Sequence, residues 1–124
     1  MAATNVGDMH RIGSSNVDNL RLKPQEAALD PPGISFLQAS SPAEVVRQLR
    51  QAFPLAIDLH RTAQVVSSTT IDKIRSAGFD VLPNPTRKLP NHFRIIHKDG
   101  ATGFLDSNLA QLSAVLTETS GHMP

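Results

Sequence analysis

The stretch "GFDVLPNPTRKLPNHFRIIHKDGATGF" (78–104) decides the expected fold, because the spacing of apolar residues changes there. The segments FDVL (79–82) and NHFRIIH (91–97) alternate apolar and polar positions, as half-buried strands do. Asp99-Gly100 is a dipeptide preferred in two-residue hairpin turns, and ATGF (101–104) follows it. The stretch therefore predicts three antiparallel strands.

Helix signals lie on the N-terminal side of these strands. Ser41-Pro42-Ala43-Glu44 has the pattern of a capping box with proline at the first helical position, so a helix is expected from there to Pro54. Thr69 and Asp72 predict the start of a further short helix, for which Gly78 supplies the left-handed C-terminal residue. LAIDLHRTAQVV (55–66) fits both a strand and a helical stripe, and we favour a helix.

A last helix is expected after the strands, with Asp106 or Ser107 as its N-cap and Gly121 beyond its end. Residues 1–33 mix Ser, Asn, Asp, Gly and Pro and keep neither period, which predicts a largely disordered arm with one helical turn at QEAAL. The expected architecture is therefore one compact α+β domain over residues 34–120. In it, N-terminal helices precede a helix, a three-stranded antiparallel sheet and a final helix.

Composition narrows the function classes. The chain has 124 residues, of which 40% are hydrophobic and 19% charged, as in one small globular domain. No apolar run reaches the roughly 18–20 residues needed to cross a bilayer, and the first thirty residues lack a secretory signal pattern. We expect no membrane contact and a cytoplasmic location, either in the producing cell or after delivery to a target cell. With no cysteine, the chain has no disulfides, thiolate zinc sites or cysteine nucleophiles.

The net charge of +1 conceals a local excess of base. Residues 1–40 hold three basic and four acidic side chains, whereas 82–98 contains four basic side chains and no acid: Arg87, Lys88, Arg94 and Lys98. Such clustering indicates a polyanionic partner, either RNA or an acidic protein, although a solvated rim has the same pattern.

The two histidines of the second expected strand differ in their surroundings. Successive side chains alternate faces, so His92 shares a face with Arg94 and Lys98, whereas His97 points to the other side. This separation argues against a shared metal, and we predict neither a metal nor a cofactor. His92 is the candidate general acid or base toward a ribose 2′-hydroxyl, and Arg94 the candidate for stabilising charge on the phosphate. Three further cations are the candidate RNA-binding residues: Arg87, Lys88 and Lys98.

The segment IDKIRSAGFDVLPNPTRKLPNHFRIIHKDGATGF (71–104) with the amphipathic helix after it resembles the HicA-like mRNA interferase toxins. Gly78-Phe79 matches that family's helix exit, FRIIHKDG (93–100) stands in place of FRHPDG, and His92 falls at the family's catalytic histidine. Pro90-Asn91 replaces the usual Gly-Ser. The resemblance covers about residues 69–117. It implies a double-stranded-RNA-binding-domain-like fold, metal-independent RNA cleavage by a small bacterial toxin or effector, and a cognate antitoxin or immunity protein as partner.

Two other hypotheses remain. His60 or Arg61 with Ser67–Thr70 imitates part of an ADP-ribosyltransferase pattern, but no Glu lies between Glu44 and Glu118 and the Ser/Thr run is explained as a helix cap. The second is a non-enzymatic adaptor, immunity or regulatory protein that docks an acidic partner through its basic loop. In that case His92 has no chemical role, whereas replacing Arg87 or Lys88 weakens binding.

Overall fold

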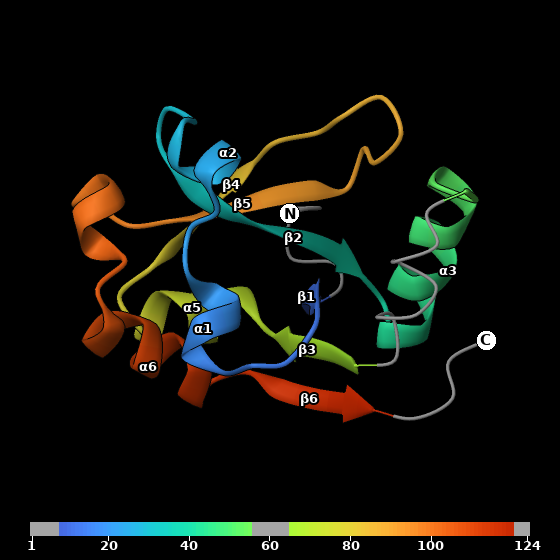
Figure 1. Cartoon of the computed structure of the whole chain (residues 1–124). Coiled ribbons are helices and arrows are strands. Elements are labelled where there is room, and N and C mark those ends of the chain that lie inside the picture. The colour runs from blue at the N-terminus through green and yellow to red at the C-terminus, as the bar shows by residue number, and fades with distance from the viewer. Residues whose placement is uncertain (1–7, 56–64, 121–124) are drawn as a thin grey trace.

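One antiparallel sheet of six strands forms the centre of the protein in the computed structural model, which describes residues 8–55 and 65–120 (Figure 1). The strand order is β4-β5-β2-β1-β3-β6, and every neighbouring pair is antiparallel. The strands are β1 (Asp8–Ile12), β2 (Gly33–Ala39), β3 (Val65–Thr69), β4 (Asp80–Pro83), β5 (His92–Ile96) and β6 (Thr117–Ser120). The helices are α1 (Val17–Leu20), α2 (Pro24–Ala27), α3 (Pro42–Ala52), α5 (Ile71–Ser76) and α6 (Asp106–Ala114), with a 3₁₀ turn η2 (Gly100–Gly103).

The prediction of a three-stranded sheet is wrong. Two of the expected strands exist as β4 and β5. The third does not form, because Gly100 (φ 67°) begins the 3₁₀ helix η2, which takes in Ala101–Gly103 of ATGF and has Phe104 as its C-cap. The other four strands lie outside the stretch that alternates clearly. In β2, both faces are largely covered, so its sequence GISFLQA does not alternate as a half-buried strand does.

Residues 8–33 also differ from the expected disordered arm. β1 lies between β2 and β3, and α1 and α2 follow it. Met9 and Leu20 are fully buried although each is an isolated apolar residue in the sequence. The elements are too short to establish a period, and part of what they bury is polar, so the hydrophobic pattern does not reveal them.

The helix starts follow the expected chemistry with small shifts. Ser41 Oγ accepts from Glu44 N at 3.2 Å, and Pro42 begins α3. The cap of α5 is Thr70, since Thr69 ends β3, and α6 begins at Asp106 with Leu105 as its N-cap. The helix expected over 55–66 lies mostly outside the described residues, but its last two positions, Val65 and Val66, belong to β3.

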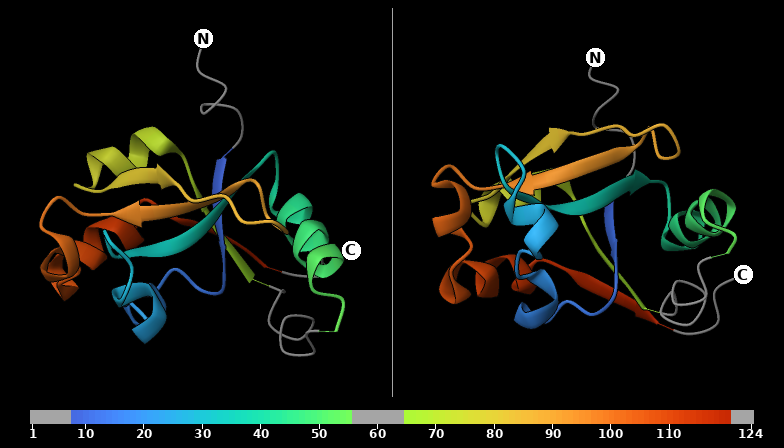
Figure 2. Two further views of the ribbon diagram at one scale, coloured as in Figure 1. Left: turned by 90° about the horizontal axis from the view of Figure 1, so that it is seen from above. Right: turned by 45° about the horizontal axis from the view of Figure 1, so that its top comes forward.

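The two faces of the sheet carry different covers. We call one the α6 face; its core joins the sheet to α5, α6 and α1 through thirteen buried residues: Met9, Leu20, Ile34, Phe36, Ile71, Ile74, Ala77, Phe79, Phe93, Ile95, Leu109, Leu112 and Leu116. We call the other the α3 face; Val45 packs there with Leu37, Ala39 and Leu89, and Val46 packs with Val66. α3 and α6 lie at opposite ends of the molecule, and the loop between β4 and β5 extends toward α3 (Figure 2).

Candidate functional site

The loop between β4 and β5 is held in a defined turn. Thr86 N donates to Leu89 O at 3.0 Å, Leu89 N donates to Thr86 Oγ1 at 3.0 Å, and His92 N donates to Leu89 O at 3.2 Å. Leu89 is 8% exposed and packs with the cluster under α3. Between these anchors, the side chains of Arg87 and Lys88 are exposed. We call Thr86–Leu89 the basic turn.

A groove of about 630 Å³ separates the basic turn from α3. Lys88 Nζ lies 5.0 Å from the ring centroid of Phe53, at the C-terminal end of α3, within the range of a cation–π contact. Amide, apolar and cationic side chains line the groove: Gln48, Gln51, Ala52, Lys88, Leu89, Pro90 and Asn91. Among these described lining residues there is no carboxylate, so the groove offers a positive and hydrogen-bonding surface.

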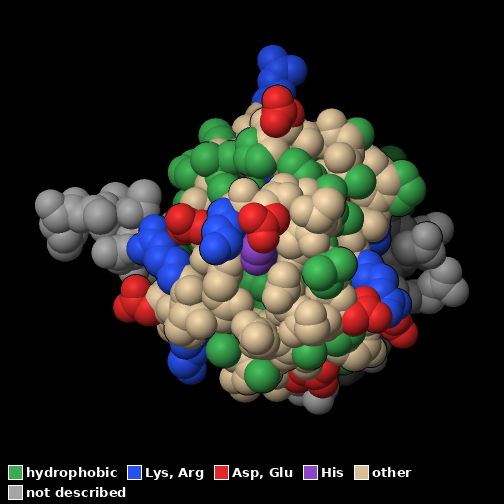
Figure 3. Space-filling view, turned by 90° about the vertical axis from the view of Figure 1, so that its left-hand side faces the viewer, with side chains coloured by type: hydrophobic (Ala, Val, Ile, Leu, Met, Phe, Trp, Pro, Cys, Tyr) green, Lys and Arg blue, Asp and Glu red, His purple; other side chains and the backbone are tan. Residues whose placement is uncertain are grey.

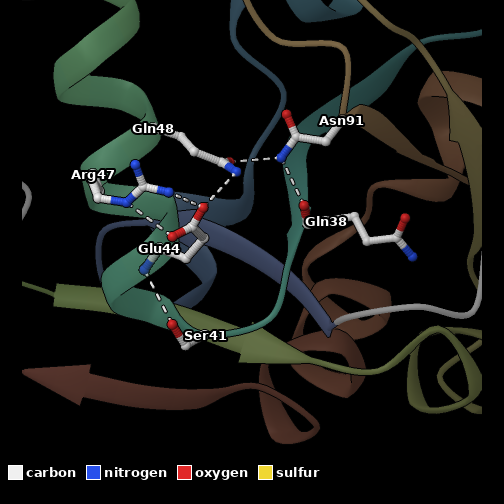
Figure 4. Close-up of polar contacts among 6 residues, drawn as sticks. All are labelled: Gln38, Ser41, Glu44, Arg47, Gln48 and Asn91. Atoms are coloured by element: carbon white, nitrogen blue, oxygen red, sulfur yellow. Dashed lines mark hydrogen bonds and ion pairs between the residues drawn. The ribbon is translucent and has the colours of Figure 1, made fainter.

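A chain of hydrogen bonds fixes one wall of the groove (Figure 4). Asn91 Nδ2 donates to Gln38 O at 2.7 Å and to Gln48 Oε1 at 2.8 Å, and Gln48 Nε2 donates to Glu44 Oε1 at 3.2 Å. Glu44 also pairs with Arg47, whose guanidinium hydrogen bond is the main cause that lowers the pKa of that carboxyl. The start of β5 is thereby tied to both α3 and β2.

His92 is half-buried on the α3 face at the start of β5. Its Nδ1 lies 2.9 Å from Asn84 O. Since a carbonyl oxygen only accepts, Nδ1 carries the hydrogen and Nε2 of the neutral ring is an acceptor. Nε2 has no hydrogen-bond partner within residues 8–55 and 65–120, and His92 lines a second cavity of about 240 Å³. This tautomer is the one that a general base requires.

Arg94 shares the α3 face with His92, but its charge is directed inward. Nη1 donates to Pro31 O at 2.5 Å and Nη2 lies 3.4 Å from Asn84 Oδ1. The stem of Arg94 crosses over Gly33, where an added Cβ would meet Arg94 Cγ at 2.9 Å and Ile95 O at 2.7 Å. Arg94 thus braces β5 against the segment that enters β2, which leaves its guanidinium less accessible to a phosphate than the sequence suggests.

Lys98 lies beyond the other end of β5, about 20 Å along the strand direction from His92 at roughly 3.3 Å per residue. It lines a different cleft, together with Arg75, Asp80 and His97. At the end of the molecule formed by η2 and α6, basic side chains lie beside acidic ones (Figure 3). Exposed ion pairs join Arg21 to Asp106 of α6 and Arg75 of α5 to Asp80 of β4. The structure therefore brings Arg87, Lys88 and His92 to one region but does not bring Lys98 there.

A buried histidine lies on β1, and no local pattern in the sequence identifies it. His10 is 1% exposed; its Nε2 lies 3.0 Å from Ala39 O and its Nδ1 lies 2.7 Å from Ser68 Oγ. Nε2 therefore donates to the carbonyl, and the Ser68 hydroxyl donates to Nδ1. Burial lowers the pKa of His10 from its usual value of 6.5. The ring is thus held neutral, with both nitrogens satisfied.

A buried ion pair lies next to His10 where β1 separates from β2. The pairing of these strands ends at His10 and Leu37. One position on, Arg11 Nη1 donates to Ser35 O at 2.9 Å, and Ser35 N donates to Glu26 Oε2 at 3.1 Å. Arg11 Nη1 lies 3.6 Å from Glu26 Oε2, and each of these side chains is 7% exposed. The pair thus replaces the backbone hydrogen bonds that β1 no longer supplies to β2.

The described residues give less support to the remaining hypotheses from the sequence. His60 and Arg61 of the ADP-ribosyltransferase pattern lie outside the described residues, and Ser67 and Thr69 are buried in β3. Within the described ranges, no three His, Asp or Glu side chains are grouped to hold a metal ion. No helix in the same ranges is long and apolar enough to span a bilayer.

Comparison with known proteins found no match to a family model, to a curated protein or to a solved structure. The resemblance to HicA-like toxins therefore stays a prediction.

Proposed function

We propose that this protein is a non-enzymatic binding module that docks an acidic, extended segment of a partner protein in the groove between α3 and the basic turn. The observation that carries the proposal is the placement of Arg87 and Lys88. Both are exposed on a turn anchored by buried Leu89, beside a groove whose described lining contains no carboxylate. Cations held on a fixed frame attract an acidic partner without a large ordering cost.

The rest of the groove suits a peptide. Gln48 and Gln51 supply amides, which pair with peptide groups as both donors and acceptors, and Ala52, Leu89 and Pro90 supply apolar contact. Phe53, at the end of α3, is 37% exposed, and its ring makes the cation–π contact with Lys88. An acidic segment with interspersed apolar residues would use all three kinds of contact.

RNA cleavage by a small toxin or effector with His92 as general base is the second candidate. The observation that favours it is the tautomer of His92, with Nδ1–H on the Asn84 carbonyl and Nε2 left as an acceptor at a cavity. Arg94 supports it less, since its guanidinium binds the Pro31 carbonyl, and Lys98 lies at the far end of β5. A cognate antitoxin and a cytoplasmic site of action belong to this candidate.

The test for the first candidate is fluorescence anisotropy of the full chain with a fluorescein-labelled peptide of alternating Glu and Leu residues. We expect saturable binding that weakens with rising salt, is lost for the Gln/Leu counterpart, and falls about tenfold or more in Arg87→Ala/Lys88→Ala. The matched control is Lys73→Ala/Arg75→Ala, which removes two cations from exposed positions on α5. Equal losses in both double variants, or no binding, would contradict the proposal.

The second candidate is tested on the same protein with a 5′-labelled single-stranded RNA in the presence of EDTA. Cleavage by the wild type that disappears in His92→Ala, while the variant keeps its fold by circular dichroism, would establish the histidine mechanism. Intact RNA together with salt-sensitive peptide binding would leave the binding module as the function.

A further inference from the structure

The second cavity, of about 240 Å³, lies where β1 and β2 separate beneath α3. β1, β2, α3 and the basic turn contribute its apolar wall: Ile12, Phe36, Leu37, Val45, Leu49 and Leu89. Sites for small molecules are concave and mostly apolar with a few polar groups, so this open, mostly apolar hollow is a candidate ligand site. It is distinct from the groove between α3 and the basic turn, with which it shares Leu89.

Hydrogen bonds within the chain hold the frame of the cavity. Arg11 and Glu26 bind the backbone of Ser35 and hold the separated strands in place, and both nitrogens of His10 have partners. A ligand entering here would therefore meet a rigid wall, which lowers the ordering cost of binding.

Three polar groups on the lining keep unused capacity, the first being the buried Nε of Arg11, which has no hydrogen-bond partner among the described residues. Nε2 of His92 has no hydrogen-bond partner among the described residues. The ammonium group of Lys23 forms no ion pair with any described residue. Lys23 is exposed, so it lies at the rim. No Asp or Glu occurs among the described lining residues, so the charge at the rim favours an anionic end on the ligand.

Size restricts the remainder of the ligand. An apolar protein cavity of about 150 Å³ accommodates benzene, so a cavity of about 240 Å³ has room for one ring or a short chain with a polar group. We propose that this cavity binds a small monocarboxylate with an apolar body. Its carboxylate pairs with Lys23, and its body packs against Leu37, Leu49 and Leu89.

The experiment is a ¹H–¹⁵N NMR titration of the full chain with benzoate, and with benzamide as a neutral probe of the same shape. We expect saturable shifts centred on Leu37, Val45 and Leu49, and tighter binding of benzoate than of benzamide. Lys23→Gln should weaken benzoate about two- to fivefold, the size of an exposed ion pair, without changing benzamide. Lys73→Gln on α5 is the matched control and should change neither.

A cavity-filling variant checks the location. Leu49→Phe should reduce the binding of both probes at least fivefold while the spectrum keeps its native dispersion; if it unfolds, Val45→Ile makes the same test with one added methyl group. The proposal is overturned by an absence of saturable shifts up to roughly 10 mM. It is also overturned by shifts confined to other surfaces, or by equal effects of Lys23→Gln and Lys73→Gln. Since Lys23 does not line the groove beside the basic turn, Lys23→Gln should leave Glu/Leu peptide binding unchanged, which separates this proposal from the first.

Discussion

Arg11 and Arg87 carry the same guanidinium group in opposite surroundings. Arg11 is 7% exposed, bonds the carbonyls of Ser35 and Asn19, and lies against Glu26, whereas Arg87 is exposed on the basic turn. Burial lowers the pKa of Arg11, and the nearby Glu26 carboxylate opposes that effect. Charge thus completes the sheet at the buried Arg11–Glu26 pair and is exposed to solvent on the basic turn, and clustering in the sequence points only to the exposed charges.

The largest effect on stability is expected from Glu26→Gln. This change keeps the size of the side chain but leaves Arg11 buried without its counter-charge and weakens the acceptor of Ser35 N. Breaking a buried pair from one side costs about 3–5 kcal/mol of unfolding free energy. Urea denaturation followed by circular dichroism measures the loss.

Asp18→Asn is the matched control, because it removes an acid from the exposed pair with Arg21. We expect little change in the denaturation midpoint of that variant. If the urea denaturation midpoint of Glu26→Gln were close to that of Asp18→Asn, the buried pair would not stabilise the association of β1 with β2. The buried charge of Arg11 would then contribute no more to the fold than an exposed one.

A smaller loss is expected from Arg94→Ala, since the bond to the Pro31 carbonyl and the contact with Asn84 are removed. Leaving a partly buried acceptor without its donor costs about 1–3 kcal/mol. The same denaturation experiment on Arg75→Ala, which breaks an exposed pair with Asp80, should show a clearly smaller loss. An Arg94→Ala protein of wild-type stability that loses RNA cleavage would return this residue to the catalytic role expected from the sequence.

The parts of the fold that the sequence predicts are those with strong local signals. The start of α3 follows from Ser41 and Pro42, and β4 and β5 follow from their alternating residues. β1 and β2 were missed because their stability depends on partners distant in the sequence, such as Ser68 for His10 and Glu26 for Ser35. No local pattern specifies such contacts.

For the candidate site too, only the residues with a local signal in the sequence could be predicted. Exposed residues of the basic turn were identified from charge alone, since Arg87 and Lys88 are consecutive. Whether a cation on a strand faces solvent or a carbonyl depends on its neighbours, so the inward guanidinium of Arg94 was not predictable. The groove itself requires the packing of Leu89 under α3, which joins segments about forty residues apart.

The stability of the protein should depend on pH through His10. Its pKa is lowered in the folded state, so below pH 6.5 the unfolded chain binds a proton that the native protein does not. The free energy of unfolding should therefore fall as the pH is lowered from 7 through 6.5, by at most about 1.4 kcal/mol per pH unit, until the native ring also becomes protonated. Denaturation midpoints at intervals between pH 7.5 and 5 test this.

His10→Gln should flatten the pH dependence in this range, although it lowers stability overall because both hydrogen bonds of a buried ring change. His92→Gln is the control for a half-buried histidine with one open nitrogen and should keep most of the slope. A slope that persists in His10→Gln would assign the pH dependence to another group.

Of the variants considered, Arg87→Ala/Lys88→Ala should have the smallest effect on stability and the largest effect on peptide binding. Arg87→Ala/Lys88→Ala removes two exposed charges from a turn whose backbone bonds and buried Leu89 remain, so the unfolding free energy should stay within about 0.5 kcal/mol of the wild type. Binding of the Glu/Leu peptide should nevertheless fall and lose most of its salt dependence, because those cations supply the attraction. Thermal unfolding and anisotropy on the same sample separate the two quantities. If this double variant is destabilised as strongly as Glu26→Gln, the basic turn is part of the structural frame, and its charges are not reserved for a partner.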